Sequence, residues 1–180
     1  MTKTSNSDVL ARDLDALEPG ALFVTQGRTI TESDVVSFSA LTGDWHPQHT
    51  DEVWAAASPF GERIAHGMLL VSCAIGLVPL DPERVLALRR VSDVVFKHPV
   101  RLGDTIHVEG RLESRRGIDE RTGLATWIWN VRTTHGRTAL RATVEILWRR
   151  SASASTPLEA EDDEREPEGA AGAGFVPLPM

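Results

Sequence analysis

The sequence predicts a protein of the α+β class, in which an antiparallel sheet wraps around one buried helix. Two observations lead to this class. The segment 65–78 is apolar on nearly every side, which for a helix means burial all round rather than on one face. From Val91 onward, apolar residues alternate with polar ones, which is the two-residue period of half-buried strands. One helix packed against such a sheet accounts for both patterns.

At least four strands are expected in the second half of the chain. The stretches RVSDVVFKHPV, TIHVEGRLE, ATWIWNVRT and TALRATVEILWRR each have strand character, and turns such as THGR are short enough to join antiparallel neighbours. The apolar residues predicted to share the inner face of the last three are Ile106, Val108, Leu112, Trp127, Trp129, Val131, Leu140, Val144, Ile146 and Trp148.

The first half of the chain predicts one strand and two helices before the buried helix. ALFVTQGRTI reads as the strand, and TESDVVSFSALTG follows it as a helix. Thr31 is the expected N-cap with Asp34 three residues on, and Gly43 is the expected stop. The apolar face of this helix is predicted to hold Val35, Phe38 and Leu41. DEVWAAAS predicts the second, shorter helix.

We expect one folded domain over residues 21–150, a polar leader over 1–20 and a disordered acidic tail over 151–180. The 180 residues supply one sizeable core and are short for two domains. The tail holds seven acidic residues and one basic residue, so it carries −6 of the net charge of −7. It has too few large apolar residues to fold. Its end, FVPLP, could alternatively be a docking peptide.

Composition also excludes several classes of protein. The single cysteine, Cys73, cannot form an internal disulfide, which favours a reducing, cytoplasmic location. The N-terminus lacks the pattern of a secretory signal, and the longest apolar run, 67–80, is too short to cross a bilayer. The folded part is nearly neutral and has no basic stripe, so neither a membrane nor a nucleic-acid partner is expected.

Titratable groups are concentrated in the loop TGDWHPQHTD, residues 42–51. Pro47 pushes His46 towards an extended conformation, so Asp44 and His49 lie on either side of a bend and can face a common space. A carboxylate and an imidazole together can hold a water molecule and move its proton. A solvated polar connection between two helices is the competing interpretation of the loop.

A second candidate element is FGERIAHGMLL, residues 60–70, where His66 and Gly67 stand at the start of the buried helix. The first N–H groups of a helix have no partner inside the helix and carry partial positive charge. A glycine there lets a ligand carbonyl approach, which suits an oxyanion. Alternatively, Gly67 only permits tight packing and His66 is an ordinary histidine at a helix start.

These two motifs, in this order and spacing, resemble the MaoC-like hydratase/dehydratase family, which includes the (R)-specific enoyl-CoA hydratases with a hotdog fold. The family pattern is approximately D-x-N-P-[ILM]-H-x-D followed by F-G-x-x-[IV]-A/V-H-G-M, and HPVRLGDT matches a later strand entry. The resemblance covers residues 20–149. This sequence departs from the family pattern at two positions, where His46 replaces an Asn and Gln48 replaces an aliphatic residue.

The resemblance implies reversible hydration of a trans-2-enoyl thioester to an (R)-3-hydroxyacyl thioester, by a homodimer. Asp44 and His49 would be the catalytic pair, Gly67 would supply the oxyanion-binding N–H, and the hydroxyl of Ser72 would help to order the site. Trp45 could shape the mouth of the acyl pocket. No cofactor is implied, because coenzyme A or an acyl-carrier protein arrives as part of the substrate.

Three alternatives accompany this interpretation. A hotdog thioesterase would use the same fold for hydrolysis, and a non-catalytic acyl-thioester-binding subunit would keep the pocket without turnover. A metal site is suggested by the H-x-x-H formed by His46 and His49, with Asp44 and His66 nearby. Pro47 splits that pair and the spacing is not that of a common metal motif, so no metal is expected.

Overall fold

The computed structural model of the chain describes residues 9–150. Its helical segments are the 3-10 helix η1 (Leu14–Ala16), α1 (Glu32–Thr42), α2 (Pro47–Thr50), α3 (Glu52–Ala57) and α4 (Gly67–Leu77). Its strands are β1 (Leu22–Val24), β2 (Arg28–Thr29), β3 (Val85–Phe96), β4 (Thr105–Gly117), β5 (Thr122–Thr133) and β6 (Thr138–Arg149).

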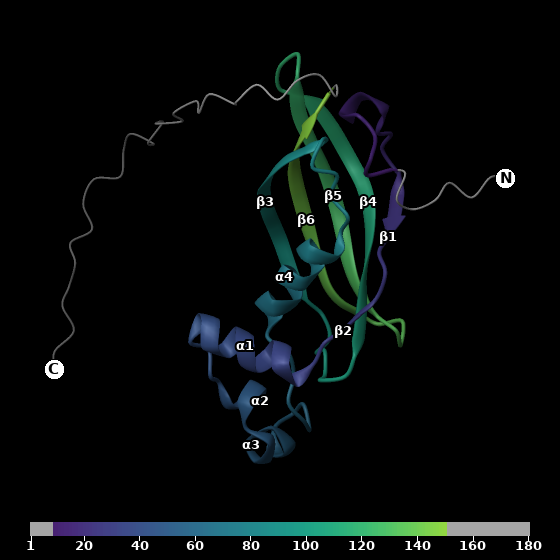
Figure 1. The fold of residues 1–180 in the computed structure, drawn as a ribbon. Coiled ribbons are helices and arrows are strands. Elements are labelled where there is room, and N and C mark those ends of the chain that lie inside the picture. The colour runs from purple at the N-terminus through teal and green to yellow at the C-terminus, as the bar shows by residue number, and fades with distance from the viewer. Residues whose placement is uncertain (1–8, 151–180) are drawn as a thin grey trace, which may run out of the picture.

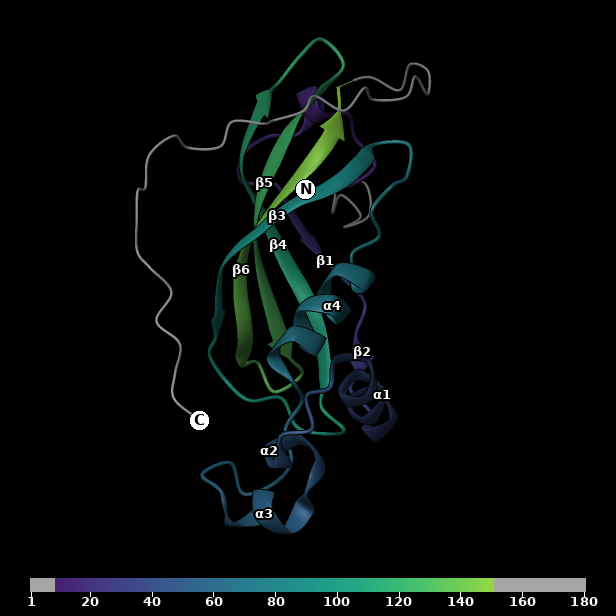
Figure 2. The ribbon, with the colours of Figure 1, turned by 90° about the vertical axis from the view of Figure 1, so that its left-hand side faces the viewer.

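The six strands form one antiparallel sheet in the order β1-β4-β5-β6-β3, with β2 also paired to β4. Strands β4, β5 and β6 follow one another as long hairpins, and β3 forms an edge next to β6. The sheet curves around α4, while α1, α2 and α3 gather beyond one end of it (Figures 1 and 2). The predicted α+β class, with a sheet around a central helix, is confirmed.

The core lies between α4 and the inner face of the sheet. All ten residues predicted for the inner face are buried. Phe23 from β1 packs edge-on against Trp127, with 5.2 Å between ring centroids. Gly110 makes this contact possible, because a Cβ at that position would lie 2.1 Å from the Phe23 ring. The alternating pattern therefore predicted the strand faces correctly, and the aromatic residues fix how the sheet closes.

The composition of α4 suggested that the helix is buried on every side. In the structure, only the side that faces the sheet is buried. Leu69, Leu70, Cys73 and Ala74 belong to the core. The stripe Met68, Ser72 and Gly76, spaced four residues apart, is exposed in the single chain. The helix is apolar enough to be enclosed, but one sheet covers only one of its sides.

Helix α1 begins and ends where its sequence predicts. Thr31 and Asp34 form a capping box, since the Thr31 hydroxyl accepts from the Asp34 N–H and the Asp34 carboxylate accepts from the Thr31 N–H. Gly43 ends the helix with a φ of 77°, in the left-handed region that favours glycine. The prediction for Leu41 was wrong: it is 83% exposed, because this end of α1 extends beyond the sheet.

The packed body begins earlier than the predicted boundary at residue 21. Val9, Leu10, Leu14 and Leu17 are all buried in the core. The indole N–H of Trp148 also donates to the carbonyl of Arg12, at 2.9 Å. These four apolar residues follow no strict period, so they were taken for part of a polar leader. Residues 1–8 and the predicted acidic tail, 151–180, lie outside the described residues. Within 9–150, none of the helices has the length and apolar character needed to span a bilayer.

Candidate active site

The loop after α1 is held by hydrogen bonds of the residues on both sides of Pro47. His46 has an extended conformation, as predicted, and its Nδ1 accepts from the Gln48 N–H at 3.2 Å, capping the short helix α2. Pro47 is the first residue of α2, where its fixed φ suits a helix and no N–H is needed. The carbonyl of Gln48 accepts from the Ile64 N–H at 3.1 Å, so the loop is tied to the segment before α4.

Asp44 stands at the exposed start of this loop with its side chain at the wall of a cavity. Its Oδ1 accepts from the His46 N–H at 3.2 Å, and its own N–H donates to the Thr42 hydroxyl at 3.3 Å. No cation pairs with its carboxylate among residues 9–150. The carboxylate therefore keeps lone pairs that can accept a proton from a ligand or a water molecule.

His49 is buried and its ring orientation is fixed by two hydrogen bonds. Nδ1 lies 2.7 Å from the carbonyl oxygen of Ile64. A carbonyl only accepts, so Nδ1 carries a proton and the neutral ring has its lone pair on Nε2. The side-chain amide of Gln48 donates to that Nε2 at 3.0 Å. Burial lowers the pKa of His49 below its ordinary value, which outweighs the opposite effect of the Ile64 carbonyl.

His66 connects the two predicted catalytic residues. Its Nε2 lies 3.1 Å from the backbone carbonyl of Asp44 and 3.2 Å from the hydroxyl of Ser39, so Nε2 donates to that carbonyl. Its ring stacks on His49 with 3.8 Å between centroids and 27° between the ring planes. Nδ1 of His66 is buried and has no partner among the described residues. His66 thus positions Asp44 through its backbone and His49 through its ring.

Asp44, His49 and His66 also bring three potential metal-ligand atoms within 4.8 Å of one another. An imidazole binds an ion in its ring plane, at about 2.0–2.1 Å for zinc. An ion shared by two stacked rings would lie far out of both planes. The Gln48 amide also occupies Nε2 of His49. The geometry fits proton transfer better than a metal site.

The N-terminus of α4 opens into the same cavity. No side chain caps this helix, and both Gly67 and Met68 line the cavity wall. The Phe96 ring lies so close to Gly67 that a Cβ there would be 2.7 Å from two ring carbons. A glycine at this position leaves room for the Phe96 ring where it lies and keeps the helix N-terminus open to the cavity. Gly67 is thus compatible with both roles considered from the sequence, which are the approach of a ligand carbonyl and tight packing.

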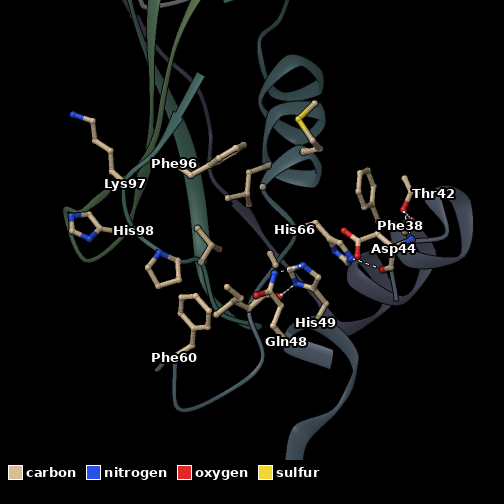
Figure 3. A pocket seen from close by; sticks show the side chains of 17 residues that line it. Phe38, Thr42, Asp44, Gln48, His49, Phe60, His66, Phe96, Lys97 and His98 are labelled. Atoms are coloured by element: carbon tan, nitrogen blue, oxygen red, sulfur yellow. Dashed lines mark hydrogen bonds between the residues drawn. The ribbon is translucent and has the colours of Figure 1, made fainter. Parts of the chain in front are cut away.

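The cavity has a volume of about 610 Å³ and runs between these groups and the segment that follows β3. Figure 3 shows Asp44 and Thr42 on one side of it and Lys97 and His98 on the other. Apolar side chains provide most of the remaining wall, namely Phe38, Phe60, Ile64, Met68, Leu70, Phe96 and Val100. The cavity combines a small polar cluster with a long apolar surface, as sites for apolar ligands do.

The structure brings together Asp44, His49, His66 and Gly67 but not the other predicted site residues. Ser72 lies on the exposed stripe of α4, where its hydroxyl donates to the Met68 carbonyl at 3.0 Å. Neither Ser72 nor Trp45 is part of the cavity wall.

His46 also lies outside the cavity wall and packs edge-on against Trp54, with 5.4 Å between ring centroids. This ring contact and the bond from the Gln48 N–H to its Nδ1 connect His46 to the loop and to α3.

Several site residues were not predicted. Phe96, Lys97 and His98 reach the cavity because β3 ends beside α4, a proximity that no local motif reveals. The role of Ser39, which contacts His66, depends on the same tertiary packing. Gln48 did carry a signal, since it stands where the motif has an aliphatic residue. Its contact with His49 became visible only in the structure.

The sheet order, the central helix and the site at its N-terminus define a hotdog-fold protein. A Mycobacterium tuberculosis protein described as having a double hotdog fold superposes with a TM-score of 0.70 at 21% identity, over 81% of this chain and 46% of that chain. A family model described as "MaoC like domain" matches residues 16–128, and the chain belongs to this family.

Named relatives cover parts of the chain. "Protein MaoC" from Klebsiella aerogenes is 38% identical over 124 residues, which is 66% of this chain and 36% of that protein. An "(R)-specific enoyl-CoA hydratase" from Rhodospirillum rubrum is 38% identical over 82 residues, 44% of this chain and 55% of that protein. The chain thus spans about a third to a half of these relatives. A "monoamine oxidase regulatory protein" from Archaeoglobus superposes with a TM-score of 0.73 at 33% identity, over 78% of this chain and 95% of that chain.

Proposed function

We propose that the protein is a hydro-lyase that adds water reversibly to trans-2-enoyl thioesters, giving (R)-3-hydroxyacyl thioesters. One observation carries the proposal: the Asp44 carboxylate and the neutral imidazole of His49 share a largely apolar cavity with the uncapped N-terminus of α4. The named hydratase relative supports the same chemistry and the R configuration.

In the proposed reaction the thioester carbonyl lies against the Gly67 N–H, where the partial positive charge of the helix N-terminus favours negative charge on oxygen. This polarises the conjugated double bond and makes C3 electrophilic. Asp44 and His49 hold a water molecule. Its oxygen bonds to C3 and one of its protons goes to Asp44. The site returns that proton to C2, which completes the addition of water and restores the Asp44 carboxylate. Nothing is oxidised or reduced, so the step needs no redox cofactor.

Gln48 must release His49 before this reaction. The Gln48 amide donates to Nε2 of His49. In the proposed reaction, the same nitrogen has to accept a hydrogen bond from the water molecule. A neutral hydrogen bond of this kind contributes about 0.5–1.5 kcal/mol net, a cost that substrate binding can meet. Because this contact leaves Nε2 of His49 unavailable to a water molecule, it also favours the second candidate function, a thioester-binding subunit without turnover.

Steady-state hydration of crotonyl thioesters, followed by the loss of conjugated absorbance, tests the proposal. Asp44→Asn keeps the hydrogen bond from the His46 N–H but removes the base, so kcat should fall by about 10²–10⁴-fold with a much smaller effect on KM. Asp51→Asn is the matched control, because Asn caps α3 as well as Asp does.

The double variant Asp44→Asn/His49→Ala should be hardly slower than Asp44→Asn, since residues that serve one step are non-additive. Unchanged turnover by folded Asp44→Asn would refute the proposal. Tight binding of the thioester by a wild-type protein that never hydrates it would establish the binding subunit instead.

A further inference from the structure

The side-chain amide of Gln48 lies in the wall of the active-site cavity, directly beside the candidate catalytic histidine. Its nitrogen donates to Nε2 of His49 at 3.0 Å (Figure 3). The backbone holds Gln48 in this place, because its N–H donates to Nδ1 of His46 and its carbonyl accepts from the Ile64 N–H. The amide therefore stands next to the atom that would receive the water molecule, on a surface that a substrate meets.

The Gln48 amide uses only part of its hydrogen-bonding capacity. A glutamine side chain offers two N–H donors and a carbonyl oxygen that accepts. Within residues 9–150, the contact with His49 is the only hydrogen bond that this side chain makes. The residue is half-buried, and its amide oxygen is not among the fully buried polar atoms, so a ligand can reach it. One N–H and the oxygen are thus available to a group that enters the cavity.

Most of the wall around this amide is apolar, with Phe60, Ile64 and Val100 among its side chains. A ligand that fills the cavity displaces the water that solvates the free amide groups. A purely aliphatic chain would leave these groups without partners, and a polar group left unpaired costs more binding free energy than a missing apolar contact. An oxygen on the ligand at this position would provide the missing partner.

We propose that Gln48 determines specificity, and that the protein acts on 2-enoyl thioesters with a hydroxyl on C4, the carbon next to the reacting double bond. The inference rests on the proposed function, because it places C3 at the water held by Asp44 and His49. C4 is bonded to C3, so its hydroxyl would lie within reach of an amide that is 3.0 Å from Nε2 of His49. The hydroxyl would accept the amide N–H in place of Nε2 and donate to the amide oxygen.

This exchange would couple recognition of the substrate to its hydration. The amide N–H that moves to the substrate hydroxyl leaves the lone pair of His49 Nε2 free for the water molecule. An alkyl group at C4 cannot accept a hydrogen bond, so the amide would stay on His49 and compete with the water. The preference for a hydroxyl should consequently appear in kcat as well as in KM.

Two substrates that differ only in a hydroxyl or a methyl group test the inference. They are the coenzyme A thioesters of 4-hydroxybut-2-enoic acid and pent-2-enoic acid, and the ratio of their kcat/KM values is measured. Gln48→Leu introduces an aliphatic residue as in the family pattern. The ratio should be about 10- to 100-fold higher in wild type than in this variant, as expected for one unpaired polar group. Comparing the same ratio in two proteins cancels the difference in intrinsic reactivity between the substrates.

The variant should also hydrate the pent-2-enoyl thioester at least as fast as wild type, because His49 is released. A residue that only held His49 in place would give the opposite result, a slower reaction with both substrates. Gln26→Leu is the matched control: it makes the same change at the other glutamine of the chain, which is exposed and outside the cavity wall, and should keep the wild-type ratio.

Two additions keep the test decisive if Gln48→Leu folds poorly or turnover is slow. Gln48→Met keeps an unbranched side chain of similar length without the amide, and should behave as Gln48→Leu does. Calorimetry with the saturated 4-hydroxybutyryl and pentanoyl thioesters of coenzyme A measures recognition without reaction. Wild type should bind the hydroxylated analogue about 10-fold more tightly, and both Gln48 variants should lose that difference.

The outcomes separate this inference from the proposed function. Hydration of both substrates with a ratio that neither Gln48 variant changes would overturn the role of Gln48 and leave the hydratase intact. Hydroxyl-dependent binding of the saturated analogues, abolished in both variants but without hydration of either substrate, would support recognition by Gln48 and refute the proposed function.

Discussion

The rings of His49 and His66 are stacked, with 3.8 Å between their centroids. Two imidazolium ions at this separation would repel each other, and the carbonyl of Ile64 can stabilise only the Nδ1–H of His49. The stacked arrangement therefore favours the neutral form of His49.

Stability should fall in mildly acidic solution because of His49. Burial lowers the pKa of His49 in the folded protein below the value of about 6.5 that it has in the unfolded chain. Above about pH 6.5 both states are neutral at this residue and it adds no pH dependence. Below that value the unfolded chain binds a proton that the folded protein does not, so stability declines until the pH passes the folded pKa. Urea denaturation at a series of pH values measures the slope.

His49→Gln should flatten that slope, whereas His135→Gln should not, because His135 is an exposed histidine. An unchanged slope in His49→Gln would mean that another group dominates the acid sensitivity. Since His49 is buried and bonded to Ile64, this variant should also be less stable than wild type at neutral pH.

His46 should prove to be a brace rather than a catalytic group. His46→Asn keeps a side-chain acceptor for the Gln48 N–H and should leave hydration intact or improve it. His46→Ala loses the cap and should cost about 1 kcal/mol of unfolding free energy. Denaturant titration and kcat measured on both variants check this. Loss of turnover in a folded, fully stable His46→Asn would show that the imidazole has a chemical role.

Gly67→Ala should impair activity more than stability. Alanine suits the first turn of a helix, but its Cβ would press on the Phe96 ring, which is half exposed and can turn aside. We expect a change of less than about 1 kcal/mol in stability. Misplaced groups at the site should lower kcat/KM by about 10²-fold. The double variant Gly67→Ala/Phe96→Leu, which relieves the contact, should recover part of the rate. Equal losses in the single and double variants would argue against this steric explanation.

The protein should be a homodimer that pairs through β3. This edge strand presents half-exposed apolar side chains, Leu88, Val95 and Phe96, and an edge with free backbone groups can pair across a two-fold axis. Light scattering should give twice the chain mass of 19.7 kDa. Val95→Lys should shift the mass towards the monomer, and Val36→Lys should not, because Val36 is also exposed but lies on α1, away from β3. A wild-type monomer at micromolar concentration would contradict the prediction.

Local patterns predicted much of the fold and part of the site. Alternation fixed the faces of β4, β5 and β6, and Thr31 with Gly43 fixed the ends of α1, because such signals act between residues close in the chain. The packing of Val9 to Leu17 was missed for lack of a period, and Leu41 was misplaced because exposure depends on what lies opposite.

The same limit applied to the site. The paired motifs located Asp44, His49, His66 and Gly67, whereas the cavity wall after β3 comes from a distant segment. Ser72 was expected near the site from its position in the motif, but which side of α4 faces the cavity is decided by the packing against the sheet.

His66 holds Asp44 by its backbone carbonyl and not by its carboxylate. The geometry of the loop is consequently insensitive to whether residue 44 is Asp or Asn. Under the proposed mechanism, a related chain could lose its base by a single nucleotide change and keep its fold, its cavity and its helix caps. Inactive descendants of such a protein would be indistinguishable from enzymes by shape alone, and the identity of one exposed side chain would be the feature that separates them.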